Sequence, residues 1–474
     1  MAAMRLHSVL LLATCAAACI GCGRTDRAVT RDPGRVSPAY VLFSPLLSTV
    51  TYLVDRDGKV VHTWQSDFAP GASVHLLDNG SLLRPARQPD VPRFRGGGLG
   101  GRLQEFAWDG RLTWDWVIAS SERLQHHDIT PLPNGNVLVL AWEAKTRDDA
   151  LRAGRLARRV GPNGLWPECV LEVRPVRPSG GIIVWEWHLW DHLVQELDLR
   201  RENYGKVADH PERVDINGDS ALQSLTSAIL DRLKSLGYIG TGTTASDLDP
   251  DFVHANAIAY NPRLDQIALT VHRYHEVWVI DHSTTTTEAA THAGGRQDRG
   301  GDLLYRWGNP AAYARGAPRD QHLFGPHDGR WVPPGYPGAG HLLVFNNGLG
   351  SPRRSSSVIE ITPPLTDGRY RVAAAGPMEP SAPTWTYPPA NARSFYADFI
   401  SGAHRLPNGN TFITAGPEGR FFEVTAEGET VWEYRNPYSG TAPNPAGDPP
   451  RSVFRATLIP ADYAGLRNLP RPPH

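Results

Sequence analysis

Short apolar runs separated by polar turns recur along this chain, and their alternation predicts strands rather than long helices. Residues 125–142, QHHDITPLPNGNVLVLAW, show the pattern most fully, with histidines, a Pro-Asn-Gly turn and an apolar run in that order. Asn-Gly between two such runs is a strong hairpin signal because both residues tolerate positive φ. The arrangement returns at His75 and His404, and looser copies begin at His254 and His327. Each of five hairpins therefore carries a histidine shortly before its turn.

A second repeated unit lies between these hairpins and consists of two strands, the last of which ends in aromatic residues. Its six copies span residues 52–64, 103–116, 170–187, 277–307, 358–387 and 422–434. Paired hairpins with an aromatic marker are typical of propeller blades, which contain four strands each. The sequence therefore predicts an all-β fold, a six-bladed β-propeller. A β-sandwich with many hairpins is the structural alternative, but it does not explain why histidine recurs at one place in each unit.

The propeller is expected over residues 38–466, between a linker at 23–37 and a short tail at 467–474. Ring closure requires the first and last strands to pair, and the apolar segments 40–43 and 453–456 are suitable partners. A partly helical insertion, 191–249, interrupts the repeats. It is short for a core of its own, so we expect it to cover one face of the central channel.

The first 22 residues have the features of an export signal, with a basic residue before the apolar stretch 9–18. That stretch is too short for a membrane span. Ile-Gly-Cys22 resembles a bacterial lipobox and predicts a lipid anchor on Cys22, with Cys15 and Cys19 as alternative sites. A signal that is cleaved without lipidation is the other interpretation. In both cases we expect an exported protein, in the periplasm or the outer cell envelope.

The composition adds two constraints. The 474 residues carry a formal net charge of −1, which gives no reason to expect nucleic acid as a partner. Three of the four cysteines lie in the export signal, so Cys169 stands alone downstream and predicts no internal disulfide.

In a propeller the innermost strand of each blade lines the central channel, so equivalent positions converge on the axis. Asp128 and Asp328, which directly follow two of the histidines, would alternate away from the axis along extended strands. Arg455 stands at the corresponding place in the sixth unit. The sequence thus predicts a ring of five histidines at one end of the channel: His75, His127, His254, His327 and His404.

Two kinds of site suit such a ring. Neutral imidazole is a common ligand of zinc, copper or iron, which favours a metal centre. The alternative is an anion site, in which Arg455 with Arg353 or Arg354 binds a sulfate or phosphate group. A histidine beside the anion would then act as nucleophile or as general acid and base.

Several stretches together resemble the bacterial arylsulfate sulfotransferases. They are residues 42–64, HHD-x₃-PLPNGN at 126–136, DFVHAN at 251–256, FNNG at 345–348 and FRA at 454–456. The resemblance covers nearly all of the chain after the export signal. It implies an exported six-bladed propeller that moves a sulfuryl group from a phenolic sulfate ester to a phenol acceptor. It further implies a sulfohistidine intermediate, with no nucleotide sulfate donor, cofactor or metal.

The resemblance also implies roles for particular residues. His404 matches the histidine that takes the sulfuryl group, and His254 and His327 match two further active-site histidines. The family's arginine lies after the F-x-N-G element, where this chain has Arg353 and Arg354; the usual arginine position before the V-x-E strand is Ser357 here. The substrate contacts implied are Arg353, Arg354, Arg455, His127, His75 and Asn256.

Other functions are checked against the same residues. Cys169 is not followed by x-Pro-x-Arg, so a formylglycine sulfatase is disfavoured. A phosphate-binding loop of the Walker type is not found. A metal-dependent propeller hydrolase or lyase, and a non-catalytic exported binding propeller, remain alternatives because both also place polar residues on the axis.

Overall fold

A computed structural model describes residues 28–91, 93–220, 226–349, 354–388, 395–440 and 450–469. The expected export signal, with its anchor at Cys22, lies outside the described residues, and so does Arg353. Among the described residues, no helix is long and apolar enough to cross a membrane.

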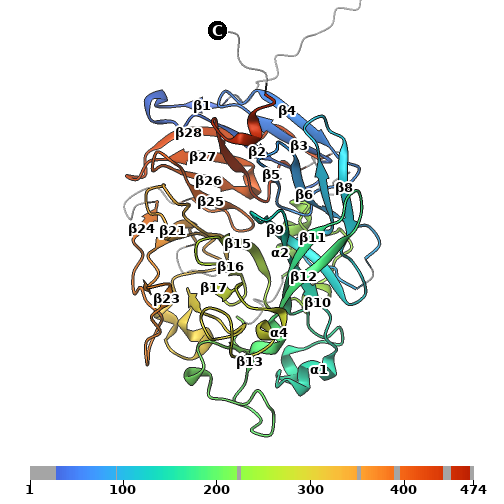
Figure 1. Ribbon diagram of the computed structural model, residues 1–474, viewed down its shortest axis with the longest axis vertical. Coiled ribbons are helices and arrows are strands. Elements are labelled where there is room, and N and C mark those ends of the chain that lie inside the picture. The colour runs from blue at the N-terminus through green and yellow to red at the C-terminus, as the bar shows by residue number, and fades with distance from the viewer. Residues whose placement is uncertain are drawn as a thin grey trace, which may run out of the picture.

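Six antiparallel sheets stand side by side around a central axis, so the chain forms the expected six-bladed β-propeller (Figure 1). From the axis outward, the first three blades are β29 (Thr457–Pro460), β2 (Ala39–Phe43), β3 (Val50–Val54), β4 (Val60–Gln65); β5 (His75–Leu76), β6 (Leu82–Arg87), β7 (Gly101–Phe106), β8 (Leu112–Val117); and β9 (Arg123–Pro131), β10 (Val137–Glu143), β11 (Glu168–Pro175), β12 (Gly181–His188). The last three are β15 (Ala255–Asn261), β16 (Gln266–Val271), β17 (Glu276–Asp281), β18 (Tyr305–Trp307); β19 (Pro326–Trp331), β20 (Leu342–Asn346), β21 (Ser357–Ile361), β24 (Trp385–Tyr387); and β25 (Gly402–Arg405), β26 (Thr411–Ala415), β27 (Arg420–Val424), β28 (Thr430–Arg435), to which β1 (Val29–Thr30) adds an outer fifth strand.

The second strand of a blade is buried on both faces because neighbouring blades pack against it. In β10 all seven residues are buried, which explains why residues 137–142 form a continuous apolar run rather than an alternating one.

The first and last strands close the ring, as predicted, but with a different partner segment. β2 pairs with β29, so Tyr40 stands opposite Ile459, whereas the expected partner was 453–456. That segment does not extend the ladder: Val453 forms only an isolated bridge with Pro45, and Arg455 turns into the channel to bind two carboxylates.

The aromatic marker of each blade has a common structural role. An indole Nε1 from the outer strand donates to a backbone carbonyl of the next blade, and these bonds run round the complete ring. The six pairs are Trp64 to Ala107, Trp114 to Gly180, Trp187 to Gly301, Trp307 to Pro380, Trp385 to Ala426 and Trp432 to Arg56, at 2.7–3.2 Å. A buried indole N–H usually finds such an acceptor, and each of these six bonds joins one blade to the next.

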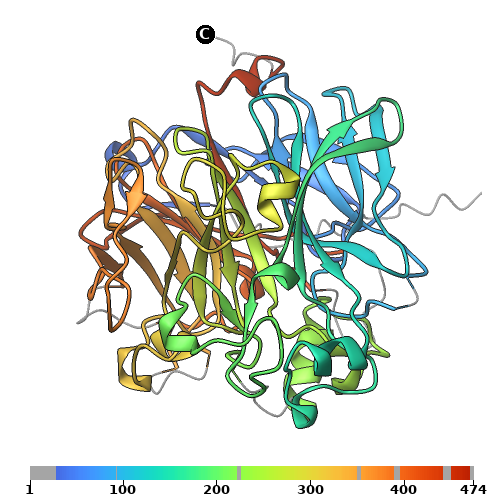
Figure 2. The ribbon, with the colours of Figure 1, turned by 60° about the horizontal axis from the view of Figure 1, so that its bottom comes forward.

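The insertion 191–249 contains β13 (Leu193–Val194), β14 (Val214–Asp215), α2 (Ser227–Ser235) and α3 (Ala245–Leu248). The Thr226 side chain caps α2 by accepting from the Ile229 N–H. Leu233, Leu236 and Tyr238 then pack against residues of the channel end such as Ile400 and Phe454. Figure 2 shows this green segment along the lower face of the propeller. The remaining α-helices and strands are α1 (Arg147–Arg152), α4 (Thr286–Ala289), β22 (Leu365–Thr366) and β23 (Arg369–Tyr370), and the described residues also contain short 3-10 helices.

Candidate active site

The five channel histidines form two sets that differ in their distance from the turn. Some, like His127 before Asn134, stand seven residues before it, whereas others, like His404 before Asn408, stand only four before it. Because a strand rises about 3.3 Å per residue, this difference moves a side chain by about 10 Å along the channel. The first set is His127, His254 and His327, and the second is His75 and His404.

Backbone geometry marks the position seven residues before the turn. φ is positive there in four blades, at 97° for Ala72, 51° for His127, 54° for His254 and 89° for Ser401. Residues other than glycine rarely adopt this conformation, and those that do cluster at bulges and functional sites. In the second and sixth blades the position is thus held by alanine and serine. The expectation of one ring of five histidines is therefore wrong.

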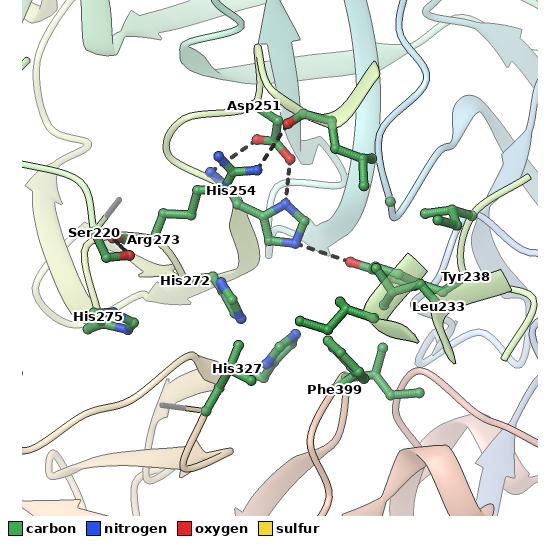
Figure 3. A pocket seen from close by; sticks show the side chains of 16 residues that line it. Ser220, Leu233, Tyr238, Asp251, His254, His272, Arg273, His275, His327 and Phe399 are labelled. Atoms are coloured by element: carbon green, nitrogen blue, oxygen red, sulfur yellow. Dashed lines mark hydrogen bonds and ion pairs between the residues drawn. The ribbon is translucent and has the colours of Figure 1, made fainter. Parts of the chain in front are cut away.

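The first set lies at a pocket where the inner strands begin (Figure 3). His254 and His327 line it directly, and His127 lies behind Tyr238. The cavity measures about 150 Å³. Its polar wall consists of Asp251, His254, His272, Arg273, His275 and His327. Its apolar wall comes from the insertion and from neighbouring loops, with Ile229, Leu233, Ile239, Leu248, Leu349, Phe399 and Ile400.

Four histidine rings lie close together at this pocket. The ring centroid of His254 is 4.7 Å from that of His127 and 5.2 Å from that of His272, which in turn is 5.5 Å from that of His327. Burial lowers the pKa of His327 to about 3. Burial, reinforced by the neighbouring histidines, also lowers the pKa values of His127 and His272 well below the usual value. These three imidazoles are therefore neutral near neutral pH.

His254 is held between an acid and a phenol. Its Nδ1 bonds to the carboxylate of Asp251, which also accepts the His254 backbone N–H at 3.1 Å. Its Nε2 is 3.2 Å from the hydroxyl of Tyr238. Burial raises the pKa of Asp251, but the opposing effects of His254 and Arg273 are greater together, and the pKa is lowered. An ionised carboxylate at Nδ1 orients this imidazole and stabilises it when it takes up a proton.

His327 has a defined tautomer. Its Nδ1 lies 2.7 Å from Oδ1 of Asn347. The amide nitrogen of Asn347 donates to the carbonyls of Ala397 and Ile400, so the orientation of this amide is fixed. The oxygen must accept from Nδ1–H, and in a neutral imidazole Nε2 then keeps its lone pair.

A glycine segment presses against the opposite side of the cluster. A Cβ at Gly97 would lie 2.2 Å from the ring of Tyr238, and one at Gly98 would lie 2.2 Å from Nε2 of His127. Gly98 has φ +72°, and its carbonyl accepts the His127 backbone N–H at 2.7 Å. Only glycine allows the backbone to approach these rings so closely.

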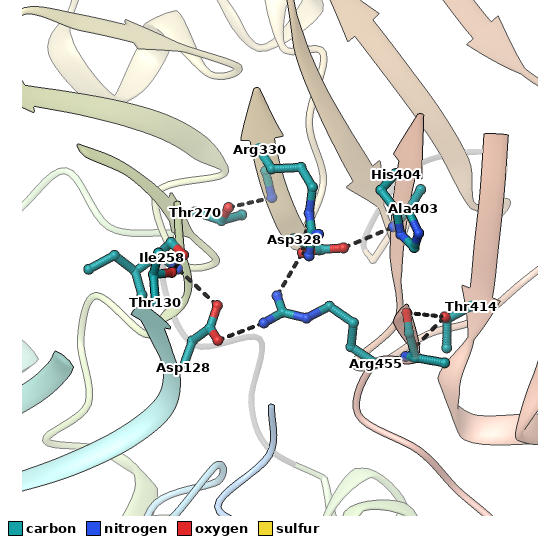
Figure 4. Close-up of polar contacts among 12 residues, drawn as sticks. Asp128, Thr130, Ile258, Thr270, Asp328, Arg330, Ala403, His404, Thr414 and Arg455 are labelled. Carbon is teal, nitrogen blue, oxygen red and sulfur yellow. Dashed lines mark hydrogen bonds and ion pairs between the residues drawn. The ribbon is translucent and has the colours of Figure 1, made fainter. Parts of the chain in front are cut away.

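Arg455 lines a second pocket, and its guanidinium lies between Asp128 and Asp328 (Figure 4). Its guanidinium donates to Asp328 and to Asp128, both at 2.6 Å. These aspartates were expected to point away from the axis, but the positive φ of His127 and of Asp328 itself (54°) breaks the alternation. Burial lowers the pKa of Arg455, yet the two carboxylates raise it by more. The expectation that Arg455 binds an anionic substrate is therefore not supported by its position, since its charge is already balanced.

His75 and His404 line this second pocket, which shares no lining residue with the first. The backbone N–H of Leu458 donates to Nε2 of His404 at 3.1 Å. Burial and the charges of Arg330 and Arg455 lower the pKa of His404 well below the usual value, so the ring is neutral and its one lone pair is engaged. The structure therefore does not bring His404 together with His254 and His327, as the resemblance had implied.

Two other residues expected to bind substrate, Arg354 and Asn256, do not line the first pocket. Arg354 is exposed, and Arg353 is outside the described residues. Asn256 is buried and donates to the carbonyl of Pro326 at 2.8 Å, so it links two inner strands, β15 and β19.

Sequence reasoning missed several residues of the pocket, among them Tyr238, Asp251, His272, Arg273 and His275. His272 and Arg273 belong to the turn between β16 and β17, in the sequence Val-His-Arg-Tyr-His. Two histidines around an arginine in a turn were a usable signal. Tyr238 comes from the insertion, and nothing local in the sequence connects it with a histidine 111 residues away.

Two groups of three described side chains have ligand atoms close enough to share a metal ion. They are Glu143, Cys169 and His188, and His192, His292 and Asp302. Neither group contains a histidine of the channel.

A model of the family described as Arylsulfotransferase (ASST) matches residues 44–437. A search of the curated proteins finds no match. Similar solved structures include a protein of unknown function from Bacteroides caccae, with 12% identity, a TM-score of 0.45 and coverage of 89% of this chain and 99% of that chain. Another is a protein from Lactobacillus plantarum, with 10% identity, a TM-score of 0.39 and coverage of 84% and 83%. A third is apo AztD from Citrobacter koseri, with 9% identity, a TM-score of 0.37 and coverage of 90% and 99%.

At TM-scores below 0.5 these structural likenesses carry no information about function. The family match is different because it spans most of the chain and includes the inner strands that hold the first pocket. The expected resemblance is confirmed: the chain belongs to the arylsulfotransferase (ASST) family, whose domain supports arylsulfotransferase activity in general.

Proposed function

We propose that this protein is an arylsulfate sulfotransferase that moves a sulfuryl group from a phenolic sulfate ester to a phenol, through a sulfohistidine. The supporting observation is the four-histidine cluster at the polar wall of the first pocket, opposite an apolar wall. An engineered protein cavity of about 150 Å³ lined by apolar side chains binds benzene. A space of similar size here suits one aromatic ring, with its sulfate ester directed at the histidines.

His327 is the nucleophile in this proposal. Its Nε2 lone pair attacks sulfur, a nitrogen–sulfur bond forms, and the bond from sulfur to the phenolic oxygen breaks, releasing phenolate. The Nδ1–H stays on the ring and donates to Asn347, so the sulfurylated imidazolium is stabilised where its positive charge develops. A pKa lowered to about 3 keeps the ring available for attack over the physiological range.

His254 is the general acid and base. It lines the same pocket, and the carboxylate of Asp251 supports its positive charge. A proton from His254 neutralises the leaving phenolate, and His254 then takes the proton of the incoming phenol. The positive charge of Arg273, on the same wall, favours a sulfonate in the pocket.

The test is the burst of phenol released when the enzyme is mixed with an aryl sulfate without acceptor. The wild-type protein should release about one equivalent per site and gain the mass of one sulfuryl group. His327→Ala should lose both, whereas His404→Ala should keep both. If a folded His404→Ala variant loses the burst while His327→Ala keeps it, the nucleophile is His404 and the active site is the second pocket.

The alternatives are separated in the same assay. Added phenol should accelerate turnover by a transferase and form a new sulfate ester, whereas a hydrolase would release sulfate and form no ester. Activity that requires an added divalent metal would favour the metal-dependent propeller enzymes.

Export is a further part of the proposal, supported by the features of residues 1–22. Labelled fatty acid should be incorporated into the wild-type protein and not into Cys22→Ser. Cleavage of the signal without any label would favour a secretory peptide that is not lipidated.

A further inference from the structure

A continuous line of hydrogen bonds runs from the buried carboxyl of Glu168, on β11, to His254 at the pocket. Its four links join Glu168 Oε2 to His126 Nε2 (2.8 Å), His126 Nδ1 to His127 Nδ1 (2.7 Å), His127 Nε2 to the Tyr238 hydroxyl (2.6 Å), and this hydroxyl to His254 Nε2 (3.2 Å). The proposed chemistry uses only its last member. Glu168 and His126 contact no substrate position, yet both are completely buried and titratable.

When Glu168 is protonated, all four hydrogen bonds can form with every donor pointing from Glu168 toward His254. Oε1 of Glu168 accepts the Ala255 backbone N–H at 2.7 Å, which leaves Oε2 to donate to His126. His126 then donates to His127, His127 donates to the Tyr238 oxygen, and Tyr238 donates to Nε2 of His254. Every nitrogen in the line has one role, and His254 is neutral.

The line is equally consistent in the opposite direction when Glu168 is ionised. His126 Nε2 then donates to the carboxylate, and each following link reverses, so the Tyr238 hydroxyl donates to His127. Its oxygen can now accept from Nε2–H of a protonated His254, whose positive charge faces Asp251. The two arrangements contain the same number of protons, and they differ by transfer of one proton along each link.

Burial makes the protonated acid the resting form. It raises the pKa of Glu168 well above the usual value, and the nearby negative charge of Asp251 raises it further. Burial also lowers the pKa of His126 to about 3, so a positive charge does not stay in the middle of the line. The charged groups that face it are Asp251, Arg273 beyond Asp251, and Arg87 near Tyr238.

The inner end of the line is closed. His126 stacks on Trp142 with ring centroids 4.0 Å apart, and a Cβ on Gly96 would touch the same indole. Glu168, His126 and His127 have no exposed surface. Protons therefore enter and leave at the pocket, where His254 and Tyr238 line the wall.

We propose that Glu168, His126, His127 and Tyr238 form a proton relay that lends one proton to His254 during the first half of sulfuryl transfer and takes it back in the second half. This inference rests on the proposed function. Its chemical reason is that transfer of a sulfuryl group between two phenols consumes no proton overall. A buried group that gives up one proton and later takes it back is therefore sufficient for the reaction.

The protons and charges balance in each half-reaction. When Nε2 of His327 displaces the phenolate, the proton of Glu168 moves to His254 through the line, and His254 passes its Nε2 proton to the phenolate. Phenol leaves, and Glu168 remains a carboxylate while the sulfuryl group is on His327. The acceptor phenol then gives its proton to His254, its oxygen bonds to sulfur, and reversal of the line restores protonated Glu168.

The test replaces Glu168 with glutamine, which keeps the shape and both hydrogen bonds but cannot release a proton. The amide oxygen accepts from Ala255, and the amide nitrogen donates to His126, so the line stays in its resting direction. Proton donation matters most for a strongly basic leaving group. Glu168→Gln should therefore slow burst release from phenyl sulfate by about 10²-fold and slow release from para-nitrophenyl sulfate much less.

Two further variants define the result. Tyr238→Phe breaks the line between His127 and His254 and should show the same dependence on the leaving group. Glu172→Gln is the matched control, because Glu172 lies on the same strand but bonds to His282 and to two asparagines outside the pocket, and it should behave as wild type. Equal losses for the two esters in Glu168→Gln would overturn the relay, since a merely structural defect does not distinguish leaving groups.

Infrared difference spectroscopy separates this inference from the proposed function. The resting protein should show the band of a protonated carboxyl that is missing in Glu168→Gln, and formation of the sulfurylated enzyme should remove it. Absence of the band in the resting protein overturns the relay whatever the activity. Failure of the wild-type protein to consume any aryl sulfate overturns the proposed function.

Discussion

The amide oxygen of Asn347 lies 2.7 Å from Nδ1 of His327 and fixes which ring nitrogen carries the proton. Asn347 is itself held by two backbone carbonyls, at 2.7 and 2.9 Å. The nitrogen proposed as nucleophile is thus defined by a residue that does not line the pocket.

Asn347→Ala should lower the rate of the burst rather than the affinity for aryl sulfate. A hydrogen bond contributes about 0.5–1.5 kcal/mol net, which corresponds to a loss of roughly two- to thirteenfold in rate. Stopped-flow measurement over a range of ester concentrations separates the two effects. A variant with unchanged maximal rate and weakened binding would contradict a role in fixing the tautomer.

Gly98→Ala should disturb the cluster more than its backbone strain alone explains. The new Cβ would meet the ring of His127 at 2.2 Å, whereas Gly135, with a similar φ of +82°, has no atom within 4 Å of such a Cβ. Both substitutions cost about 1–2 kcal/mol for the left-handed backbone. Only Gly98→Ala should also reduce the burst rate, and overpacking should lower its free energy of unfolding by about 1–3 kcal/mol more.

Urea unfolding and burst kinetics of the two variants side by side measure the difference. If Gly98→Ala and Gly135→Ala lose the same stability and both keep full activity, close contact between this glycine and His127 is not important.

The sequence was sufficient to predict the six blades because each repeats a hairpin signal and an aromatic marker. The tryptophans show why the marker persists: each bonds to the next blade, so the ring needs one in every unit. Closure of the ring by strands from the two ends of the chain was also predicted, but the closing strand is 457–460 and not 453–456.

The candidate site was predicted less well. The repeats were aligned by their turns, and this alignment does not show how far along the channel each histidine lies. The spacing of seven residues in His127 and four in His404 was visible in the sequence, but its meaning depends on the bulge at the positive φ of His127. The contribution of Tyr238 depends on how the insertion folds over the channel. Such long-range packing leaves no local pattern.

Stability should fall as the pH is lowered below 6.5. The folded-state pKa values of His126 and His327 are lowered to about 3, and the unfolded chain binds protons near 6.5, so between these values the unfolded state holds more protons. Stability therefore rises with pH in this window and is lost toward its acid end. Each such histidine contributes a slope of up to about 1.4 kcal/mol per pH unit.

His272→Asn tests this pH dependence of stability, because burial lowers the pKa of His272 well below the usual value. The midpoint of urea unfolding of the variant should depend less steeply on pH than that of the wild type.

The ion pair of His282 should depend on pH in the opposite direction. Despite desolvation, its acidic partners raise the pKa of His282 to about 9, so its contribution is complete below pH 6.5 and is lost as the pH rises through about 9.

Replacement of Arg455 tests whether the bridge between Asp128 and Asp328 is structural. Arg455→Met should destabilise the protein by about 3–5 kcal/mol, because it leaves a buried charge without its partner. Asp328 keeps Arg330, so the uncompensated group is Asp128, which retains only the imidazole of His75, 3.9 Å away, in place of the guanidinium.

The double variant Arg455→Met with Asp128→Asn should recover most of that stability, since it removes the unpaired charge along with the cation. In the single variant the pKa of Asp128 rises above its usual value, so the folded state binds a proton that the unfolded state lacks. The single variant should therefore approach the double variant at low pH and fall behind it as the pH increases. Because neither residue touches the first pocket, the double variant should still release the phenol burst. A well-folded double variant without a burst would instead place the second pocket in the reaction.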